Sequence, residues 1–270
     1  MDQVQKIELS PEEETLLITL YTKATACPST ILADEKAHEI LERVDYDYAK
    51  LRVPTGTRLT VCLRAKKFDQ YVEEFLSAHP RGTVLHLGCG LDTRFVRVDD
   101  GQVQWYDLDL PGVIKLRENF FEETDRYHMI PSSVTALEWM ESIPRPGEAV
   151  LVIAEGLLMY LEEEQVKALI RKLKERYPGC TLAFDAFSTL TARNVRRNPS
   201  LRATGAVIRW GIDDPRQIEG WAEGIRLLEE WYFVQSEYIR EFGLTSRMMF
   251  KLAGFFPVAN KAHRILKFEL

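Results

Sequence analysis

The sequence has few cysteines and histidines, and they stand far apart. Its four cysteines, Cys27, Cys62, Cys89 and Cys180, form no C-x-x-C pair, and its five histidines form no H-E-x-x-H motif. These absences exclude a zinc knuckle and a zincin-type helix, so we expect no metal site. They also predict a reducing, cytoplasmic location and no disulfide framework.

Long apolar runs and an excess of basic residues are also missing. No stretch approaches 18 uncharged apolar residues, and the polar start MDQVQKIELSPEEE lacks the apolar core of a secretory signal. The formal net charge is −6, whereas phosphate binding requires a basic surface. We therefore expect neither a membrane nor a nucleic acid as partner. Nothing in the sequence fixes the oligomeric state.

The first 80 residues are predicted to be helical. Ser10 to Glu13 read as a capping box with proline at the first helical position, followed by an apolar face of Leu16, Leu17, Leu20 and Ala24. A second helix is expected over Asp34–Val44 and a third over Thr60–Ala78, because their apolar residues recur at helical spacing.

From residue 83 short apolar strands alternate with helices such as Glu162–Tyr177. The tail adds two further strands with a helix, Thr245–Ala253, between them. This alternation predicts an α/β fold, a Rossmann-like, mostly parallel seven-stranded sheet with helices on both faces and a helical N-terminal extension. The expected strands are Thr83–Leu87, Gln102–Asp107, Tyr127–Pro131, Ala149–Ala154, Thr181–Asp185, Arg226–Glu237 and Ala262–Leu270.

The length of 270 residues suits a single domain. We expect a helical cap over 1–80, a cofactor-binding core over 83–186, an insert over 187–225 and C-terminal strands over 226–270. The part of the insert from Asn194 to Gly224 is rich in Arg and Trp, which is consistent with a lid or a substrate wall. A solvated pair of surface helices is the alternative.

A glycine turn, Gly88-Cys89-Gly90, closes the first strand. In open α/β sheets ligands bind outside the carboxyl ends of the strands, and a helix expected near Leu91-Asp92 would favour a negative group there. Asp107 and Asp109 end the second strand about 20 residues later, the position of an acid that binds a ribose diol. A helix-capping aspartate before Pro111 is the alternative.

The third position of the G-x-G-x-x-G fingerprint of NAD sites is Thr93 here, so that fingerprint fails. S-adenosylmethionine has a ribose and an adenine but no phosphate, and it needs only the looser turn and the acid. The spacing therefore favours S-adenosyl-L-methionine as cofactor.

Several longer motifs resemble one known family. LGCGLDTR resembles the signature of the leucine carboxyl methyltransferase family, which includes bacterial polyketide O-methyltransferases of the tetracenomycin type. The resemblance continues over most of the chain, in Tyr21–Ala37, Leu63–Leu76, Tyr106–Val113 and Val152–Val166. It implies a class I S-adenosylmethionine-dependent methyltransferase whose seven-stranded sheet has an antiparallel last strand.

The resemblance also implies site residues. Lys23 and Arg64 would bind the cofactor's methionine carboxylate, Gly88 would meet its methionine portion, and Asp109, with Asp107 near it, its ribose. Cys89 and Gly90 of the same turn are also expected to bind the cofactor. Glu155 would face the methyl-transfer site, and with Tyr160 it is a candidate catalytic residue, although a tyrosine with a buried ring and a bonded hydroxyl is the alternative. The family often has an aspartate that binds adenine, where this chain has Ser132 and Ser133. Ser133 and Val134 are therefore the expected adenine contacts.

The methyl acceptor is expected to be a carboxylate of a small, polyketide-like molecule. A carboxylate is ionised at neutral pH and needs no general base, and His86, His128 and His263 all fall in strands where packed or surface histidines are usual. Arginines of the insert could hold an anion: Arg193, Arg196, Arg197, Arg202 and Arg209. The alternatives are a hydroxyl O-methyltransferase, a non-catalytic S-adenosylmethionine-binding protein and an NAD-dependent oxidoreductase.

Overall fold

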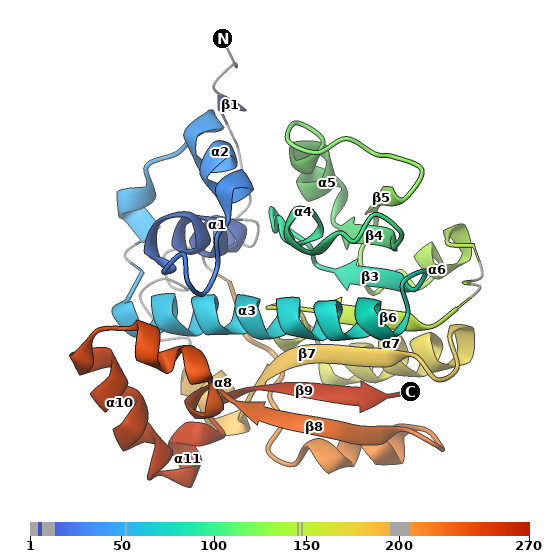
Figure 1. Ribbon diagram of the computed structural model, residues 1–270. Coiled ribbons are helices and arrows are strands. Elements are labelled where there is room, and N and C mark those ends of the chain that lie inside the picture. The colour runs from blue at the N-terminus through green and yellow to red at the C-terminus, as the bar shows by residue number, and fades with distance from the viewer. Residues whose placement is uncertain (1–4, 7–13, 52, 145, 147, 195–205) are drawn as a thin grey trace.

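The computed structural model describes residues 5–6, 14–51, 53–144, 146, 148–194 and 206–270. Its centre is a twisted sheet of seven strands, within those residues, in the order β5-β4-β3-β6-β7-β9-β8 (Figure 1). The bounds are β3 (Thr83–Leu87), β4 (Gln104–Asp109), β5 (Tyr127–Pro131), β6 (Val150–Ala154), β7 (Thr181–Phe187), β8 (Arg226–Tyr232) and β9 (His263–Glu269).

The pairs among β3 to β7 are parallel, and β9 runs antiparallel to both β7 and β8. The predicted fold, including the antiparallel last strand, is therefore confirmed. Successive residues of one strand face opposite sides, so Leu151 and Ile153 join one core cluster and Val150 and Val152 join the other.

Helices cover both faces of this sheet. The first core cluster packs the long α3 (Thr55–Ala78) and the N-terminal α1 (Glu14–Ala26) and α2 (Glu35–Arg43) against one face, and the second packs α6 (Trp139–Ser142) and α7 (Glu163–Arg176) against the other. Figure 1 shows α3 crossing in front of the sheet and α7 behind it. Among these residues no helix is long and apolar enough to cross a membrane.

The remaining elements are short. They are β1 (Gln5–Lys6) and β2 (Val44–Asp45), which pair in parallel, the helices α4 (Arg94–Val98), α5 (Pro111–Arg117), α8 (Thr189–Asn194), α10 (Leu244–Gly254) and α11 (Pro257–Asn260), and the 3-10 helices η1 (Tyr48–Leu51), η2 (Leu158–Tyr160), η4 (Pro215–Trp221), η5 (Phe233–Gln235) and η6 (Glu237–Glu241).

Several predicted boundaries were wrong. The third helix begins at Thr55 instead of Thr60, and the fifth strand continues past Asp185 to Phe187. The second strand starts two residues later, at Gln104, because Asp100 accepts hydrogen bonds from the backbone of Gln102 and Val103 and closes a turn there. The sixth strand ends at Tyr232, where a capping box opens η5. The helix after the glycine turn begins at Arg94 instead of residue 91. The capping box expected at residues 10–13 lies outside the described residues.

The expectation that no cysteines pair was also wrong. Cys27, which follows α1, forms a disulfide with Cys62 in α3, while Cys89 and Cys180 are free and buried. The partners are 35 residues apart, and only the packing of α1 on α3 brings them together. A count of cysteines could not show this proximity.

Candidate active site

A cavity of 660 Å³ opens at the carboxyl ends of β3, β4 and β6, the edge where open α/β sheets bind ligands. Its walls come from α1, α3, the glycine turn, residues 132–135, η2, residues 206–209 and the start of β9. Nearly every predicted site residue lines it: Lys23, Arg64, Gly88, Cys89, Gly90, Asp109, Ser133, Val134, Glu155 and Tyr160. The exception is Asp107.

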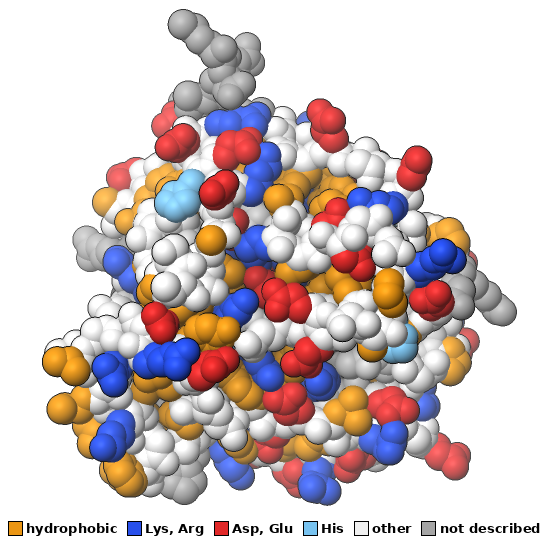
Figure 2. Space-filling model, viewed as in Figure 1, with side chains coloured by type: hydrophobic (Ala, Val, Ile, Leu, Met, Phe, Trp, Pro, Cys, Tyr) orange, Lys and Arg blue, Asp and Glu red, His pale blue; other side chains and the backbone are white. Residues whose placement is uncertain are grey.

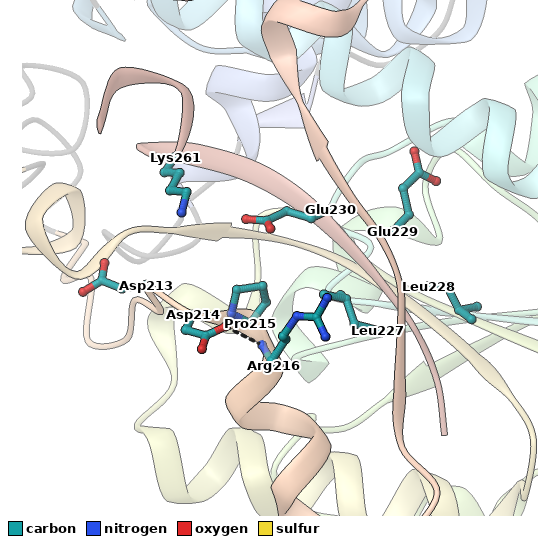
Figure 3. Close-up of a pocket in the computed structure, with 9 residues that line it drawn as sticks. All are labelled: Asp213, Asp214, Pro215, Arg216, Leu227, Leu228, Glu229, Glu230 and Lys261. Carbon is teal, nitrogen blue, oxygen red and sulfur yellow. Dashed lines mark hydrogen bonds between the residues drawn. The ribbon is translucent and has the colours of Figure 1, made fainter. Parts of the chain in front are cut away.

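A second, smaller cavity lies between η4 and the edge strand β8 (Figure 3). Figure 3 shows Asp214 accepting a hydrogen bond from the backbone of Arg216, the bond that caps η4. Its walls are largely charged, and no glycine turn or strand carboxyl end of the parallel sheet reaches it. We therefore place the candidate site in the larger cavity.

The glycine turn is held in a backbone conformation that suits glycine. Gly88 and Gly90 have φ of 66° and 52°, and a Cβ on Gly88 would lie 2.8 Å from a methyl carbon of Leu157. The backbone N–H groups of Gly88 and Cys89 donate to the carbonyl of Leu108, at the end of β4. The turn is thereby fixed beside the two acidic residues of that strand.

Thr93, which breaks the dinucleotide fingerprint, has a structural task. Its hydroxyl donates to the carboxylate of Asp34 at 2.6 Å, and Asp34 also caps α2 through the backbone N–H of Ala37. A third glycine would remove this link between the turn and the N-terminal helices.

Asp109 faces the cavity and bridges the turn to the strand. Its two carboxylate oxygens accept from the backbone N–H of Gly90 and of Leu110, each at 2.7 Å. Burial raises the pKa of Asp109, against the opposing effect of these two bonds. A carboxylate has about four acceptor positions, so Asp109 can still accept hydrogen bonds from a diol in the cavity.

Asp107, two residues earlier, points to the interior. It accepts from Arg117, Tyr127 and Trp105, and it lies 3.1 Å from the ring of His86. Burial would raise the pKa of Asp107, but Arg117 and His86 lower it to about 2. Because Arg117 also donates to the Gly90 carbonyl, this network supports the turn from below. Asp107 therefore does not meet the cavity, and its position gives no support to ribose binding.

Glu155 is the centre of a buried group of ion pairs. Its carboxylate pairs with Arg64 at 3.0 Å and with Arg94, and Lys23 lies 3.9 Å away. Burial would raise the pKa of Glu155, but the charges of Lys23, Arg94 and Arg64 outweigh this effect and lower it. An ionised, fully paired carboxylate is poorly suited to proton transfer, so these contacts favour a positioning role.

The two predicted cations each have a second carboxylate partner. Arg64 donates to Asp185 at 2.8 Å, and Lys23 pairs with Asp92 at 2.9 Å. Both side chains still line the cavity, where a cofactor carboxylate could join them. Sequence reasoning missed Asp92 and Asp185, although Asp185 stands as a lone charge in a buried strand, a position that demands a partner.

The serines of the predicted adenine side lie on the cavity wall. The hydroxyl of Ser133 is 2.9 Å from that of Thr135, and Val134 is buried next to them. Val134, Leu110 and Val113 give this end an apolar surface, with hydroxyls at its rim.

Two histidines that sequence reasoning set aside also reach the cavity. His263, the first residue of β9, lies 2.7 Å from Asp185 through its Nε2. Burial would raise the pKa of Asp185, but Arg64 and His263 hold it well below its usual range, so the carboxylate accepts the Nε2–H. Burial lowers the pKa of His263, which leaves Nδ1 unprotonated at neutral pH. His86 is held by Asp107.

The insert supplies part of the wall beside His263. Residues 206–209 line the cavity with Tyr160 and Phe187, and Arg209 pairs with Glu162 at 3.0 Å. Of the predicted arginines, Arg193 is exposed on α8, whereas Arg196, Arg197 and Arg202 lie outside the described residues. The prediction of a substrate wall is consistent with the cavity contacts of residues 206–209.

Comparison with known proteins decides the family. Residues 21–174 match the model of the leucine carboxyl methyltransferase family. The chain belongs to this family. It is 38% identical over 267 residues, 98% of both chains, to the tetracenomycin polyketide synthesis O-methyltransferase TcmP of Streptomyces glaucescens. It is 29% identical to the S-adenosyl-L-methionine-dependent methyltransferase dpfgK of Gibberella zeae, over 95% of this chain and 94% of that one.

Solved structures agree on the fold. A DUF574 family protein from Streptomyces avermitilis superposes with a TM-score of 0.58 at 13% identity, over 92% of this chain and 99% of that chain. Magnesium protoporphyrin IX methyltransferase from Synechocystis, solved with S-adenosylmethionine, gives 0.51 at 12% identity, over 97% and 99%. Together the family model and the curated relatives confirm the predicted family, an S-adenosylmethionine-dependent O-methyltransferase as the enzyme class, and the cofactor.

The residues of the cavity fit that cofactor. Asp109, a partly buried carboxylate, lies at the strand end where a ribose diol would bind, and the glycine turn beside it lines the cavity. Its lining also includes the cations Lys23 and Arg64 and an apolar group around Val134. Among the described residues, no group of three or more His, Cys, Asp or Glu side chains could hold a metal ion.

Proposed function

We propose that this chain methylates a carboxylate oxygen of a small, polyketide-like molecule, with S-adenosylmethionine as methyl donor. The observation that carries the proposal is the cavity, which joins a fitting cofactor site to a mostly apolar wall. Membership of the leucine carboxyl methyltransferase family and the likeness to a polyketide O-methyltransferase support the acceptor class.

We call the part of the cavity formed by α1, α3, the glycine turn and residues 132–135 the cofactor half. Asp109 would accept from the ribose hydroxyls, Lys23 and Arg64 would hold the carboxylate, and Ser133 with Val134 would contact adenine. The bound cofactor supplies a methyl group on a sulfonium. Glu155 would keep Arg64 and Arg94 in place, a positioning role, while Asp107 is left out of this set.

We call the part formed by η2, Phe187, residues 206–209 and His263 the acceptor half. Its apolar side chains would exclude water and align the acceptor oxygen with the methyl group, which is what an in-line displacement requires. A carboxylate, with a pKa near ~4, is already the nucleophile at neutral pH. Arg209 lies at this wall and would offer a positive charge to it.

A hydroxyl acceptor is the second candidate, and one observation favours it. His263, oriented by Asp185, presents the arrangement of a general base, which a hydroxyl needs and a carboxylate does not. With this candidate base in the cavity, a hydroxyl acceptor competes with a carboxylate.

Calorimetry with S-adenosylmethionine tests the cofactor half. We expect Asp109→Ala and Arg64→Ala each to weaken binding by about tenfold or more, because each loses a charge-assisted hydrogen bond. Asp100→Ala, at an exposed turn away from the cavity, is the matched control and should bind like the wild type. Unchanged affinity in both variants would reject these residue assignments.

Matched acceptors test the acceptor half. We expect turnover of an aromatic polyketide acid and none of the same ring system bearing only a phenol, measured by transfer of a labelled methyl group. His263→Asn should then retain most of the activity. Turnover of the phenol, abolished by His263→Asn while cofactor binding persists, would establish the hydroxyl candidate instead.

A further inference from the structure

The helix α10 exposes an apolar side that no other described part of the chain covers. Leu244, Met248 and Leu252 recur every four residues and therefore share one side of the helix, with exposures between 56% and 78%. Phe255 and Phe256 continue this surface with exposures of 70% and 62%, and Val258 in α11 lies just beyond them. We call these six residues the α10 face.

This concentration is unusual for the molecule. Twelve large hydrophobic side chains are exposed in the described residues, and seven of them, the α10 face with Met249, fall between residues 244 and 258. Only Phe250 of α10 is buried. Scattered exposed hydrophobics need no explanation, but a contiguous group of this kind indicates an interaction surface.

The charged residues of α10 itself are all positive, whereas η6, which packs against α10, carries Glu237 and Glu241. Residues 242–262 contain Arg247, Lys251 and Lys261 and no Asp or Glu, in a chain whose net charge is −6. Arg247 and Lys251 are exposed on α10, each one position before a residue of the face, and neither forms an ion pair within the described residues. Figure 2 shows orange and blue surfaces together at the lower left, where Figure 1 places α10 and α11.

We propose that the α10 face binds the surface of an anionic lipid bilayer. Large apolar side chains flanked by cations are the composition of helices that lie in the membrane interface, and the cations add attraction to an anionic surface. A symmetric contact between two copies is disfavoured, since it would bring Arg247 and Lys251 toward their equivalents with no acid in the segment to offset them.

The α10 face lies close in the chain to the acceptor half of the cavity. The chain passes from α11 directly into β9, whose first residue, His263, lines the cavity. Attachment through α10 therefore holds the acceptor half of the cavity close to the lipid, where apolar acceptors concentrate. This does not conflict with the lack of a membrane-spanning helix, although it reverses the expectation that no membrane is a partner.

Sedimentation with lipid vesicles tests the proposal on the full chain. Vesicles of phosphatidylglycerol with phosphatidylcholine should carry down the wild type at least tenfold more than vesicles of phosphatidylcholine alone, with a loss at high salt. Leu252→Asp and Phe255→Asp should remove this binding. Leu228→Asp, at an exposed leucine of β8 outside the face, is the matched control and should still bind.

Binding of cofactor by every variant, measured by calorimetry, shows that each is folded and separates this test from that of the proposed function. Two results would overturn the proposal. One is equal, negligible sedimentation with both vesicle types. The other is a dimer in light scattering that Leu252→Asp and Phe255→Asp convert to monomer while vesicles bind none of the proteins, since the face would then be an interface between copies.

Discussion

The two halves of the cavity differ in the kind of side chain that lines them. The cofactor half is lined by charged groups that already have partners in the protein: Lys23 with Asp92, and Arg64 with Asp185 and Glu155. The acceptor half is mostly apolar, and its arginine, Arg209, forms an exposed pair with Glu162. Ion pairs therefore hold the side chains of the cofactor half in position, whereas the acceptor half would bind its ligand mainly by the fit of apolar surfaces.

Burying charged side chains costs desolvation free energy, which closely paired opposite charges must offset. Arg94 is fully buried and pairs with Asp69, Asp92 and Glu155, so its guanidinium holds three carboxylates together. Such networks stabilise a fold little compared with apolar packing, but removing one member leaves charges without partners. We expect mutations in the two halves to differ accordingly.

The largest effect should come from Arg94→Ala. Three buried carboxylates would lose their shared partner, so we expect the free energy of unfolding to fall by about 3–5 kcal/mol. Chemical denaturation measures it. Arg126→Ala, which removes a partly exposed pair with Asp99, is the control and should cost less than about 1 kcal/mol. Equal losses in the two variants would refute the contrast between buried and exposed pairs.

Loss of the Cys27–Cys62 disulfide should come next. The bond joins the end of α1 to α3, the two helices that carry Lys23 and Arg64, and it closes a loop of 35 residues. Chain entropy predicts a loss of about 4 kcal/mol for a loop of this length. Thermal unfolding of Cys27→Ala with and without reductant measures this, because reductant should lower the midpoint of the wild type alone. A wild type indifferent to reductant would contradict the bond.

A smaller effect is expected from acid, through Asp107. Its pKa in the folded state is about 2, below the ordinary 3.8, so the stabilisation is fully present above about pH 4 and is lost as pH falls toward 2. The shift corresponds to about 2 kcal/mol. Unfolding free energies of the wild type and Asp107→Asn measured between pH 2 and 7 should approach each other as the pH falls toward 2. A constant difference across that range would argue against this ionisation.

The smallest effect should come from Arg209→Ala in the acceptor half. Its ion pair is exposed, so stability should change by less than about 1 kcal/mol. The KM for a carboxylate acceptor should rise a few-fold while cofactor affinity stays the same, as steady-state kinetics and calorimetry would show. Arg216→Ala, on η4 at the other cavity, is the control. An equal rise of KM in both variants would mean that Arg209 has no special contact with the acceptor.

The sequence by itself determined the sheet and most of the cofactor half. The spacing of apolar residues along the chain predicts which segments are strands and which are helices. The glycine turn and Asp109 are also local signals, because their spacing is typical of a cofactor site at the end of a parallel strand. The same local reasoning could not separate Asp107 from Asp109. Both are acids near one strand end and share a face, but Asp107 lies inside the sheet opposite His86 and pairs with Arg117, whereas Asp109 lies beyond the last β3 partner, at the cavity.

The tertiary structure alone decided the contacts between distant segments. Asp185 and His263 are 78 residues apart, and they meet because β9 pairs antiparallel with β7. Cys27 meets Cys62, and Arg94 meets Glu155, in the same way, through packing of helices and strand ends. Side-chain pairing depends on distances across the fold, and local periodicity carries no information about them.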